Sequence, residues 1–408
     1  MLTKLLTSLK NDAIRRTFGY YFLFICLGLD LAIIGPTLPA LAEQTTSRLG
    51  QMGLLFLASS IGYTLGTMVS GRVFDRVRGH PVLGIAQLFV AVLLIFLPLA
   101  PWFWLLLTIM VCKGFAEGFI NTGANILLVW THGDKVSPFM NGLHFFFGLG
   151  AFLSPFLVAQ FVGIQGGYRW AYWAMAAIAV LVGLRMLTMK GSPTPTHAQK
   201  GDTVRPARGP IPYALVVAAM LFLFFYVGAE ITFGGWVYTY AVTLKLASVA
   251  GAAYLTSAFW LAFTVGRLIS IPAATRFKPR QVIPAALVGC LSILALGIVF
   301  FNSSAVLWLM AIGLGFFMAP IWPTGFTLAG QSINLTGGLT SVILLGDSFG
   351  GMVLPSAVGQ VIESTGPRAM VYLIFCSLVM TFVSFFGMVR LRPAKPHSED
   401  ANEFKVPV

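Results

Sequence analysis

The stretch VLGIAQLFVAVLLIFLPL, Val82–Leu99, contains no charged residue. As an α-helix it would cross most of the hydrocarbon core of a bilayer, which about 20 apolar residues span. The whole chain of 408 residues has the same character, because 57% of it is hydrophobic and only 10% is charged. Soluble domains carry about 25% charged residues. The composition therefore excludes a water-soluble fold and predicts an all-α polytopic membrane protein.

Similar apolar runs recur along the chain. We predict twelve transmembrane helices: Thr17–Leu41, Gly50–Ser70, Val82–Leu99, Trp102–Trp130, Met140–Gly163, Trp170–Met189, Tyr213–Val242, Val249–Ser270, Val282–Phe301, Val306–Ala329, Leu339–Ile362 and Ala369–Val389. A polar, Pro- and Gly-rich stretch that cannot cross lipid separates the sixth from the seventh. We therefore expect two six-helix bundles, with these boundaries: an amino-terminal segment 1–16, a first bundle 17–189, a linker 190–210, a second bundle 211–389 and a tail 390–408.

Lysine and arginine residues set the expected orientation. With the amino terminus inside, 21 of the 26 lie in the tails and loops of the inner side, and Lys113 lies within a helix. The remaining four lie outside: Arg48, Arg169, Lys245 and Arg368. This distribution predicts cytoplasmic termini and a multi-pass protein of the plasma membrane, or of the inner membrane in a bacterium. The net charge of +13 does not indicate nucleic-acid binding, because the basic residues form no single patch.

The sequence lacks the motifs that are typical of several functional classes. All four cysteines fall in apolar runs, which disfavours a disulfide scaffold or a cysteine metal cluster. The chain has no Gly-rich loop ending in Gly-Lys-Ser or Gly-Lys-Thr, so direct ATP drive is disfavoured. Because we find no catalytic constellation, we expect neither enzyme activity nor a cofactor.

The two halves match each other at an offset of 200 residues. Equivalent positions carry similar residues: Gly150, Pro155 and Gln160 against Gly350, Pro355 and Gln360, and Asp30 against Glu230. A repeat of six helices suits alternating access, in which one half rocks against the other around a site at the midplane. The repeat thus predicts two bundles related by a pseudo-two-fold axis.

Four acids are expected near the middle of helices: Asp30, Glu117, Glu230 and Asp347. A lone charge at that depth costs at least ~2.5–3.5 kcal/mol, so each acid needs a partner or a polar cavity. We predict that these acids carry a coupling ion, either a proton or sodium. Lys113 lies four residues before Glu117 on the same helical face. The alternative, that Lys113 and Glu117 only neutralise each other's charge, stays open.

Polar residues recur every four positions along the fourth predicted helix. Lys113, Glu117, Asn121 and Asn125 form a stripe about 18 Å long. A polar stripe at membrane depth should face a cavity, and amide groups both donate to and accept from sugar hydroxyls. We therefore expect Lys113, Asn121 and Asn125 to contact the solute. Hydrogen bonding between helices is the alternative.

Glycine and proline accompany two of the acids. Glu230 is followed by Gly234-Gly235, and Asp30 by Gly35-Pro36 and Pro39. Such residues permit a helix break or a close approach and can expose carbonyl oxygens. A carboxylate with freed carbonyls would suit sodium at Asp30 or Glu230, whereas a desolvated acid would suit a proton. The sequence leaves both alternatives open.

Aromatic rings near these polar positions are further candidates for solute contact. We select Tyr226, Trp236, Trp260 and Trp322, because such rings stack on a pyranose face. His144 is added because it lies inside a predicted helix and can bind solute or relay protons. Packing is the alternative role for each of them.

The loop after the second predicted helix reads Gly71-Arg-Val-Phe-Asp75-Arg76-Val-Arg78-Gly79-His80. It resembles the Gly-x-x-x-Asp-Arg-x-Gly-Arg-Arg/Lys motif of the major facilitator superfamily, with Arg78-Gly79 in place of Gly-Arg. The resemblance implies the major facilitator fold and an inner gate built from this loop and Arg276, which belongs to a degenerate second copy. It also implies that Asp75 meets a helix terminus of the second half, near the eleventh helix, when the inside is closed.

Three longer stretches resemble the sodium-dependent glucose transporter and fucose permease branch of that superfamily. They run from Glu117 to Asn125, from Leu143 to Pro155 and from Tyr226 to Trp236. Fucose permease couples to protons through an Asp of its first helix and a Glu of its fourth, and Asp30 and Glu117 match those positions. Its sodium-using relatives leave the identity of the ion open.

These observations together predict a secondary active transporter that takes up a small polar solute, such as a monosaccharide, with a cation. Two alternatives are proton-driven efflux of drugs or metabolites and a transporter-like sensor. We expect a monomer in membrane lipid.

Overall fold

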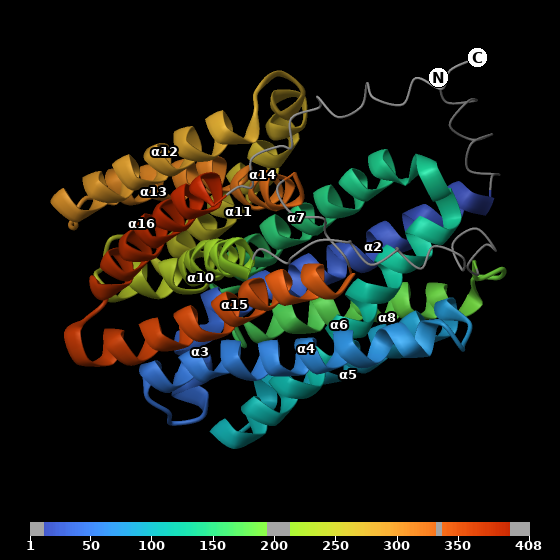
Figure 1. The fold of residues 1–408 in the computed structure, drawn as a ribbon. Helices are drawn as coiled ribbons and strands as arrows, with labels where there is room; N and C mark the ends of the chain where they lie inside the picture. The colour runs from blue at the N-terminus through green and yellow to red at the C-terminus, as the bar shows by residue number, and fades with distance from the viewer. Residues whose placement is uncertain (1–11, 194–212, 332–336, 392–408) are drawn as a thin grey trace, which may run out of the picture.

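The computed structural model describes residues 12–193, 213–331 and 337–391, and every regular element in these ranges is a helix (Figure 1). The first half contains α2 (Asp12–Ala32), α3 (Ile34–Gln44), the short η1 (Leu49–Met52), α4 (Gly53–Phe74), α5 (Gly79–Phe96), α6 (Phe103–His132), α7 (Val136–Phe161) and α8 (Arg169–Thr188). The second half contains α10 (Tyr213–Thr243), α11 (Val249–Arg276), α12 (Pro279–Val299), α13 (Ser304–Met318), α14 (Ile321–Gly330), α15 (Gly337–Thr365) and α16 (Ala369–Arg390).

The described helices account for the twelve predicted spans. Eleven are long and apolar enough to cross a membrane, and α2 with α3 forms a twelfth, broken span bent by 49°. The first span begins at Asp12 rather than Thr17, and the tenth is divided into α13 and α14. Pro320, which has no N–H to continue the helix, lies at that division. Most of the predicted linker and tail lies outside the described residues.

The bend between α2 and α3 follows from proline. Pro36 cannot donate a hydrogen bond to the carbonyl of Ala32, and its ring would clash with that oxygen in a straight helix. The helix therefore breaks at Ile33, three residues after Asp30. By contrast α10 stays continuous through Gly234 and Gly235, so of the two alternatives given for these glycines, a helix break and a close approach, the break does not occur.

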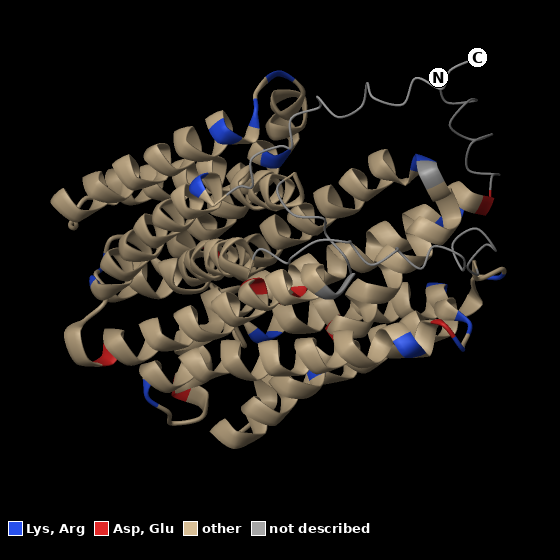
Figure 2. Cartoon of the chain, viewed as in Figure 1, with Lys and Arg blue, Asp and Glu red and all other residues tan. Residues whose placement is uncertain are grey.

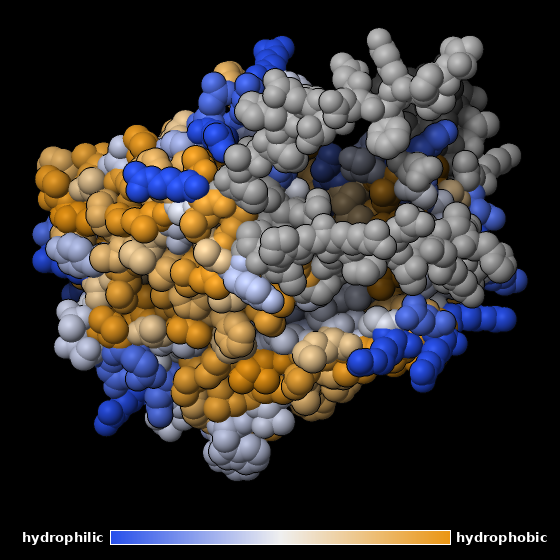
Figure 3. All heavy atoms as spheres, viewed as in Figure 1, coloured by the Kyte–Doolittle hydropathy of each residue, from blue (hydrophilic) through white to orange (hydrophobic). Residues whose placement is uncertain are grey.

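Each half forms its own helical bundle. In the first, α2 packs on α7, α4 on α6 and α5 on α8; in the second, α10 packs on α15 and α16, and α11 on α13. Apolar side chains cover the sides of the helices, whereas charged residues gather at their ends (Figures 2 and 3). A lipid environment accounts for this distribution, since apolar surface along the helices faces no water in a bilayer.

The bundles meet along α7 with α11, α4 with α15, and α3 with α10. We call the helix ends near Asp12, Thr188 and Tyr213 the terminal side, and the opposite ends the far side. The repeat is visible here, because Gln160 and Gln360 both reach the other bundle at the far side. Gln160 Nε2 donates to Tyr254 Oη over 2.7 Å, and Gln360 Nε2 donates to the backbone oxygen of Gly50 over 3.3 Å.

Backbone contacts close the far side. Ser356 Oγ donates to the carbonyl of Gly53 over 2.8 Å, and Arg48 pairs with Glu363 at 3.6 Å. A Cβ on Gly359 would lie 2.9 Å from the backbone oxygen of Gly50, closer than real side chains approach. Glycine at position 359 therefore lets α15 lie directly against the start of α4.

Enlarging this contact should hold the far side open. We expect Gly359→Val to shift the protein away from the closed state, because overpacking costs about 1–3 kcal/mol, or about fivefold to 150-fold in the equilibrium. A cysteine replacing Phe56 in a cysteine-free background should then react faster with a maleimide. Gly163→Val is the matched control, since a Cβ there meets nothing within 4 Å. Equal labelling rates in the two variants would contradict the role of Gly359.

Candidate solute and ion site between the bundles

In the first bundle, Lys113 joins two acids that lie far apart in sequence. Its ammonium forms an ion pair with Glu117 one turn along α6 and donates to the backbone oxygen of Asp30 over 3.4 Å. All three residues are buried, with Lys113 1%, Glu117 8% and Asp30 2% exposed. Both acids lie within electrostatic range of the ammonium. The structure thus brings together three of the predicted site residues.

The polar stripe continues along α6 with the two asparagines. Both are half-buried, and Asn125 Nδ2 donates to the backbone oxygen of Asn121 over 2.8 Å. Tyr63 of α4 makes polar contact with the Asn121 side chain and lies within electrostatic range of Glu117 and, in the other bundle, Asp347. The stripe therefore lies where the two bundles face each other.

In the second bundle, the remaining two acids have neutral partners. Asp347 Oδ1 accepts a hydrogen bond from Trp322 Nε1 over 3.1 Å, and the Trp322 ring is stacked on Phe326. Glu230 is 8% exposed and makes polar contact with Tyr226. The Tyr226 hydroxyl donates to the carbonyl of Met318 over 2.7 Å, at the end of α13.

Arg267 is a site residue that the sequence analysis missed. We counted it with the inner side and expected Lys113 to be the only basic residue near the midplane. The structure instead places Arg267 within electrostatic range of Glu230 and Asp347, with its guanidinium 4.5 Å above the Phe263 ring. A charge inside the predicted span Val249–Ser270 was the available signal. Tyr63 carried no comparable signal, because nothing in the sequence distinguishes it from a packing tyrosine.

Two predicted tryptophans belong to the contact between bundles. Trp236 is fully buried, donates to the carbonyl of Pro355 over 3.0 Å and packs against Phe56. A solute could reach it only if the far side opened. Trp260 is 2% exposed and its Nε1 has no hydrogen-bond partner among the described residues. It lines a cavity of about 10 Å³, which has room for one water and not for a sugar.

No metal site built from side chains is found. Within the described ranges, no group of three His, Cys, Asp or Glu side chains is placed to hold a metal. At Gly234-Gly235 the structure shows the other alternative, a close approach of α3 to α10. A Cβ on Gly35 would lie 2.8 Å from the Gly234 oxygen. The continuous α10 keeps its carbonyls in the helix, so freed oxygens beside Glu230 are not available to an ion.

His144 lies within electrostatic range of Arg267, whereas the gate residues lie on the terminal side. His144 is exposed on α7, with its ring edge-on to Phe24 at 5.8 Å. Asp75, Arg76, Arg78 and Arg276 are exposed on the terminal side, and Asp75 has no ion pair among the described residues. Gly71 has open space around it. Residues 332–336, just before α15, lie outside the described ranges, so the predicted partner of Asp75 stays a prediction.

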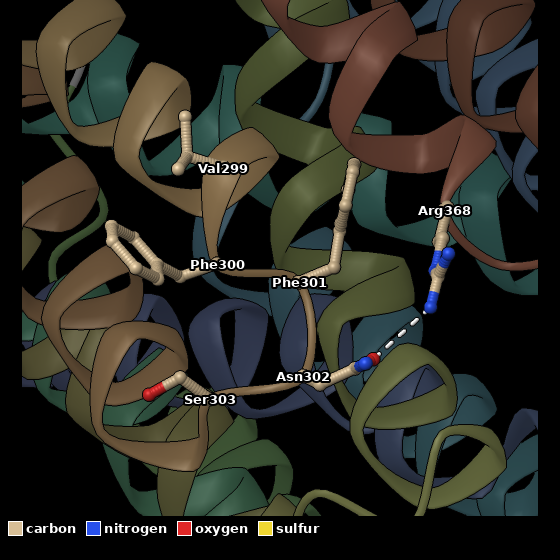
Figure 4. A pocket seen from close by; sticks show the side chains of 6 residues that line it. All are labelled: Val299, Phe300, Phe301, Asn302, Ser303 and Arg368. Atoms are coloured by element: carbon tan, nitrogen blue, oxygen red, sulfur yellow. Dashed lines mark hydrogen bonds between the residues drawn. The ribbon is translucent and has the colours of Figure 1, made fainter.

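A surface pocket lies elsewhere. It measures about 450 Å³ and lies at the far end of the second bundle, where Arg368 donates to Asn302 Oδ1 over 3.1 Å (Figure 4). Its other lining residues are Val299, Phe300, Phe301 and Ser303. Because all six belong to one end of one bundle, rocking of the bundles would not expose this pocket alternately to the two sides.

Comparison with known proteins agrees with this two-bundle arrangement. The family model described as Major Facilitator Superfamily matches residues 20–338. The chain belongs to the major facilitator superfamily. It is therefore an integral, multi-pass membrane transporter and not an enzyme, and the predicted fold of two six-helix bundles is confirmed.

One relative within the superfamily carries a name from the predicted branch. The mouse protein named sodium-dependent glucose transporter 1A is 29% identical, over 93% of this chain and 97% of its own length. Zebrafish major facilitator superfamily domain-containing protein 4A is 28% identical, over 96% and 91%. Among solved structures, a D-xylose–proton symporter matches with a TM-score of 0.75 at 13% identity, covering 92% of this chain and 97% of its own. A nucleoside transporter matches with a TM-score of 0.70 at 15% identity, covering 94% and 100%.

The ion pair in α6 gives a testable expectation for stability. Lys113→Met should lower stability by about 3–5 kcal/mol, because it leaves the buried Glu117 carboxylate without its cation. The double variant Lys113→Met/Glu117→Gln should recover part of this loss. Thermal unfolding in detergent would measure these two variants and Glu117→Gln alone, and a double variant whose loss of stability equals the sum of the two single losses would contradict the pairing.

Proposed function

We propose that this transporter takes up a small polar solute, a monosaccharide, together with a proton or sodium. The observation that best supports the proposal is the polar stripe of α6. It combines a buried ion pair with two half-buried asparagines where the bundles face each other. Amide groups can donate to and accept from ring hydroxyls, and a purely apolar solute would leave them unsatisfied.

The names of the relatives support the same solute class. Two of the proteins matched above are named for glucose and for D-xylose, and one of those names includes sodium and the other a proton. We infer that Asn121 and Asn125 bind the sugar and that it stacks on the ring of Trp322, which donates to Asp347 in the other bundle. Asp30 and Glu117 then serve as coupling acids, because their charge states can change as the site opens to each side.

The orientation follows from the distribution of basic residues. If both termini are cytoplasmic, as the positive-inside rule predicts, the far side is the outside. The arrangement described above is then closed to the outside. Sugar bound at the stripe would leave toward the cytoplasm.

A thermal-shift series tests the proposal as a whole. Purified protein would be heated with glucose, D-xylose or a nucleoside, with and without sodium, at several pH values. We expect a monosaccharide to stabilise the protein and the coupling ion to enlarge the effect. Stabilisation by the nucleoside alone would contradict a sugar site.

Coupling through Asp30 has its own test. Asp30→Asn should abolish gradient-driven accumulation in liposomes yet leave exchange of labelled for unlabelled sugar intact, because a neutral side chain no longer binds and releases the ion. Asp12→Asn is the matched control in the same helix, since Asp12 is exposed and pairs with Arg15. Accumulation that persists in the Asp30 variant would rule out the assignment.

Solute binding by the stripe is tested with Asn125→Ala. Loss of one hydrogen-bonding partner costs about 1–3 kcal/mol, so we expect sugar affinity measured by calorimetry to fall by about fivefold to 150-fold. Asn302→Ala, at the far end of the second bundle, should bind like the wild type. Unchanged affinity in the Asn125 variant would place the sugar elsewhere.

A further inference from the structure

Each bundle carries one basic and two acidic side chains at its centre. In the first bundle these are Lys113, Asp30 and Glu117, and in the second they are Arg267, Glu230 and Asp347. With all six side chains ionised, each set has a net charge of −1. The two sets come from different positions in the repeat, since only Asp30 and Glu230 are equivalent at the 200-residue offset.

In the first bundle, geometry decides which acid lacks a cation of its own. The Lys113 ammonium pairs with the Glu117 carboxylate, and its contact with Asp30 is to the backbone oxygen. The Asp30 carboxylate is 2% exposed, beside the break between α2 and α3. The Lys113 ammonium lies within electrostatic range of this carboxylate but is paired with Glu117, so two buried carboxylates share one cation and the position of Asp30 favours binding of a second.

In the second bundle, the basic side chain, Arg267, forms an ion pair with neither acid. Among the described residues Arg267 has no ion pair within 4.0 Å, whereas Lys113 has one. The Asp347 carboxylate accepts from the neutral Trp322, and the Glu230 carboxyl contacts the neutral Tyr226. One guanidinium thus lies near the buried Glu230 carboxylate and the half-buried Asp347 carboxylate, and this set also has one negative charge in excess.

We infer that each bundle binds its own coupling cation, so that two cations move with each neutral solute. The inference rests on the proposed function and adds its stoichiometry. Asp30 holds the cation of the first bundle, and Glu230 with Asp347 holds that of the second. The competing arrangement keeps one acid of the second bundle protonated throughout the cycle, and in that case only one charge moves.

The number of charges moved per sugar can be measured as a reversal potential. Wild-type protein in liposomes would receive a tenfold gradient of labelled glucose, with equal pH and equal sodium on both sides and the voltage set by potassium and valinomycin. Net flux should vanish at about 30 mV if two charges move and at about 59 mV if one charge moves. A value near 30 mV supports two cations.

A value near 59 mV would overturn the inference and leave the proposed cation-coupled transport intact. Glucose flux that does not respond to voltage or to either ion gradient would instead overturn the proposed coupling, and the inference with it. These outcomes use the wild-type protein, so they do not depend on the folding of any variant.

A variant then tests which residue binds the cation of the second bundle. Glu230→Gln should leave the one charge coupled at Asp30 and move the reversal potential to about 59 mV per tenfold gradient. Glu43→Gln is the control, because Glu43 is an exposed carboxylate at the end of α3 and should keep the wild-type value. A Glu230→Gln protein that still reverses at the wild-type voltage would remove Glu230 from the second site.

Discussion

An ionised side chain in the middle of a lipid bilayer requires a counter-charge or a polar cavity, and this requirement organises the centre of the molecule. Lys113 is 1% exposed and is tolerated because it pairs with Glu117 and contacts Asp30. The acids of the second bundle rely on Trp322, Tyr226 and the nearby Arg267. All of these groups gather where the bundles face each other, since the sides of the helices face lipid.

The internal repeat also determines how the two bundles contact each other. Gln160 and Gln360 occupy equivalent positions in the repeat. The side-chain amide of each donates a hydrogen bond to the other bundle at the far side. Glycines bring the backbones together there, with Gly359 against the start of α4 and Gly35 against α10. All of these contacts join one bundle to the other, so they can break when one bundle rocks against the other.

The residues of the candidate site differ in how well the sequence pattern predicted their positions. The spacing of Lys113, Glu117, Asn121 and Asn125 predicted their common face, because helical geometry fixes that face from sequence. Trp236 matched a plausible pattern but lies in the closed far side, with its N–H bonded to Pro355. Arg267 was assigned to the inner end of its helix, and only packing of α11 against its neighbours shows that it faces Glu230 and Asp347.

The sequence by itself determined the membrane environment, the twelve spans, the two bundles and the acids at midplane depth, because hydropathy and helical period are local properties. Proline in the first span indicated where its backbone would be disturbed, and the structure breaks that helix at Ile33. Tertiary structure decided which acid meets which base, which bundle ends touch and which aromatic rings are enclosed. Those outcomes depend on contacts between residues far apart in the chain, such as Lys113 with Asp30 and Ser356 with Gly53, and neither periodicity nor composition specifies such pairs.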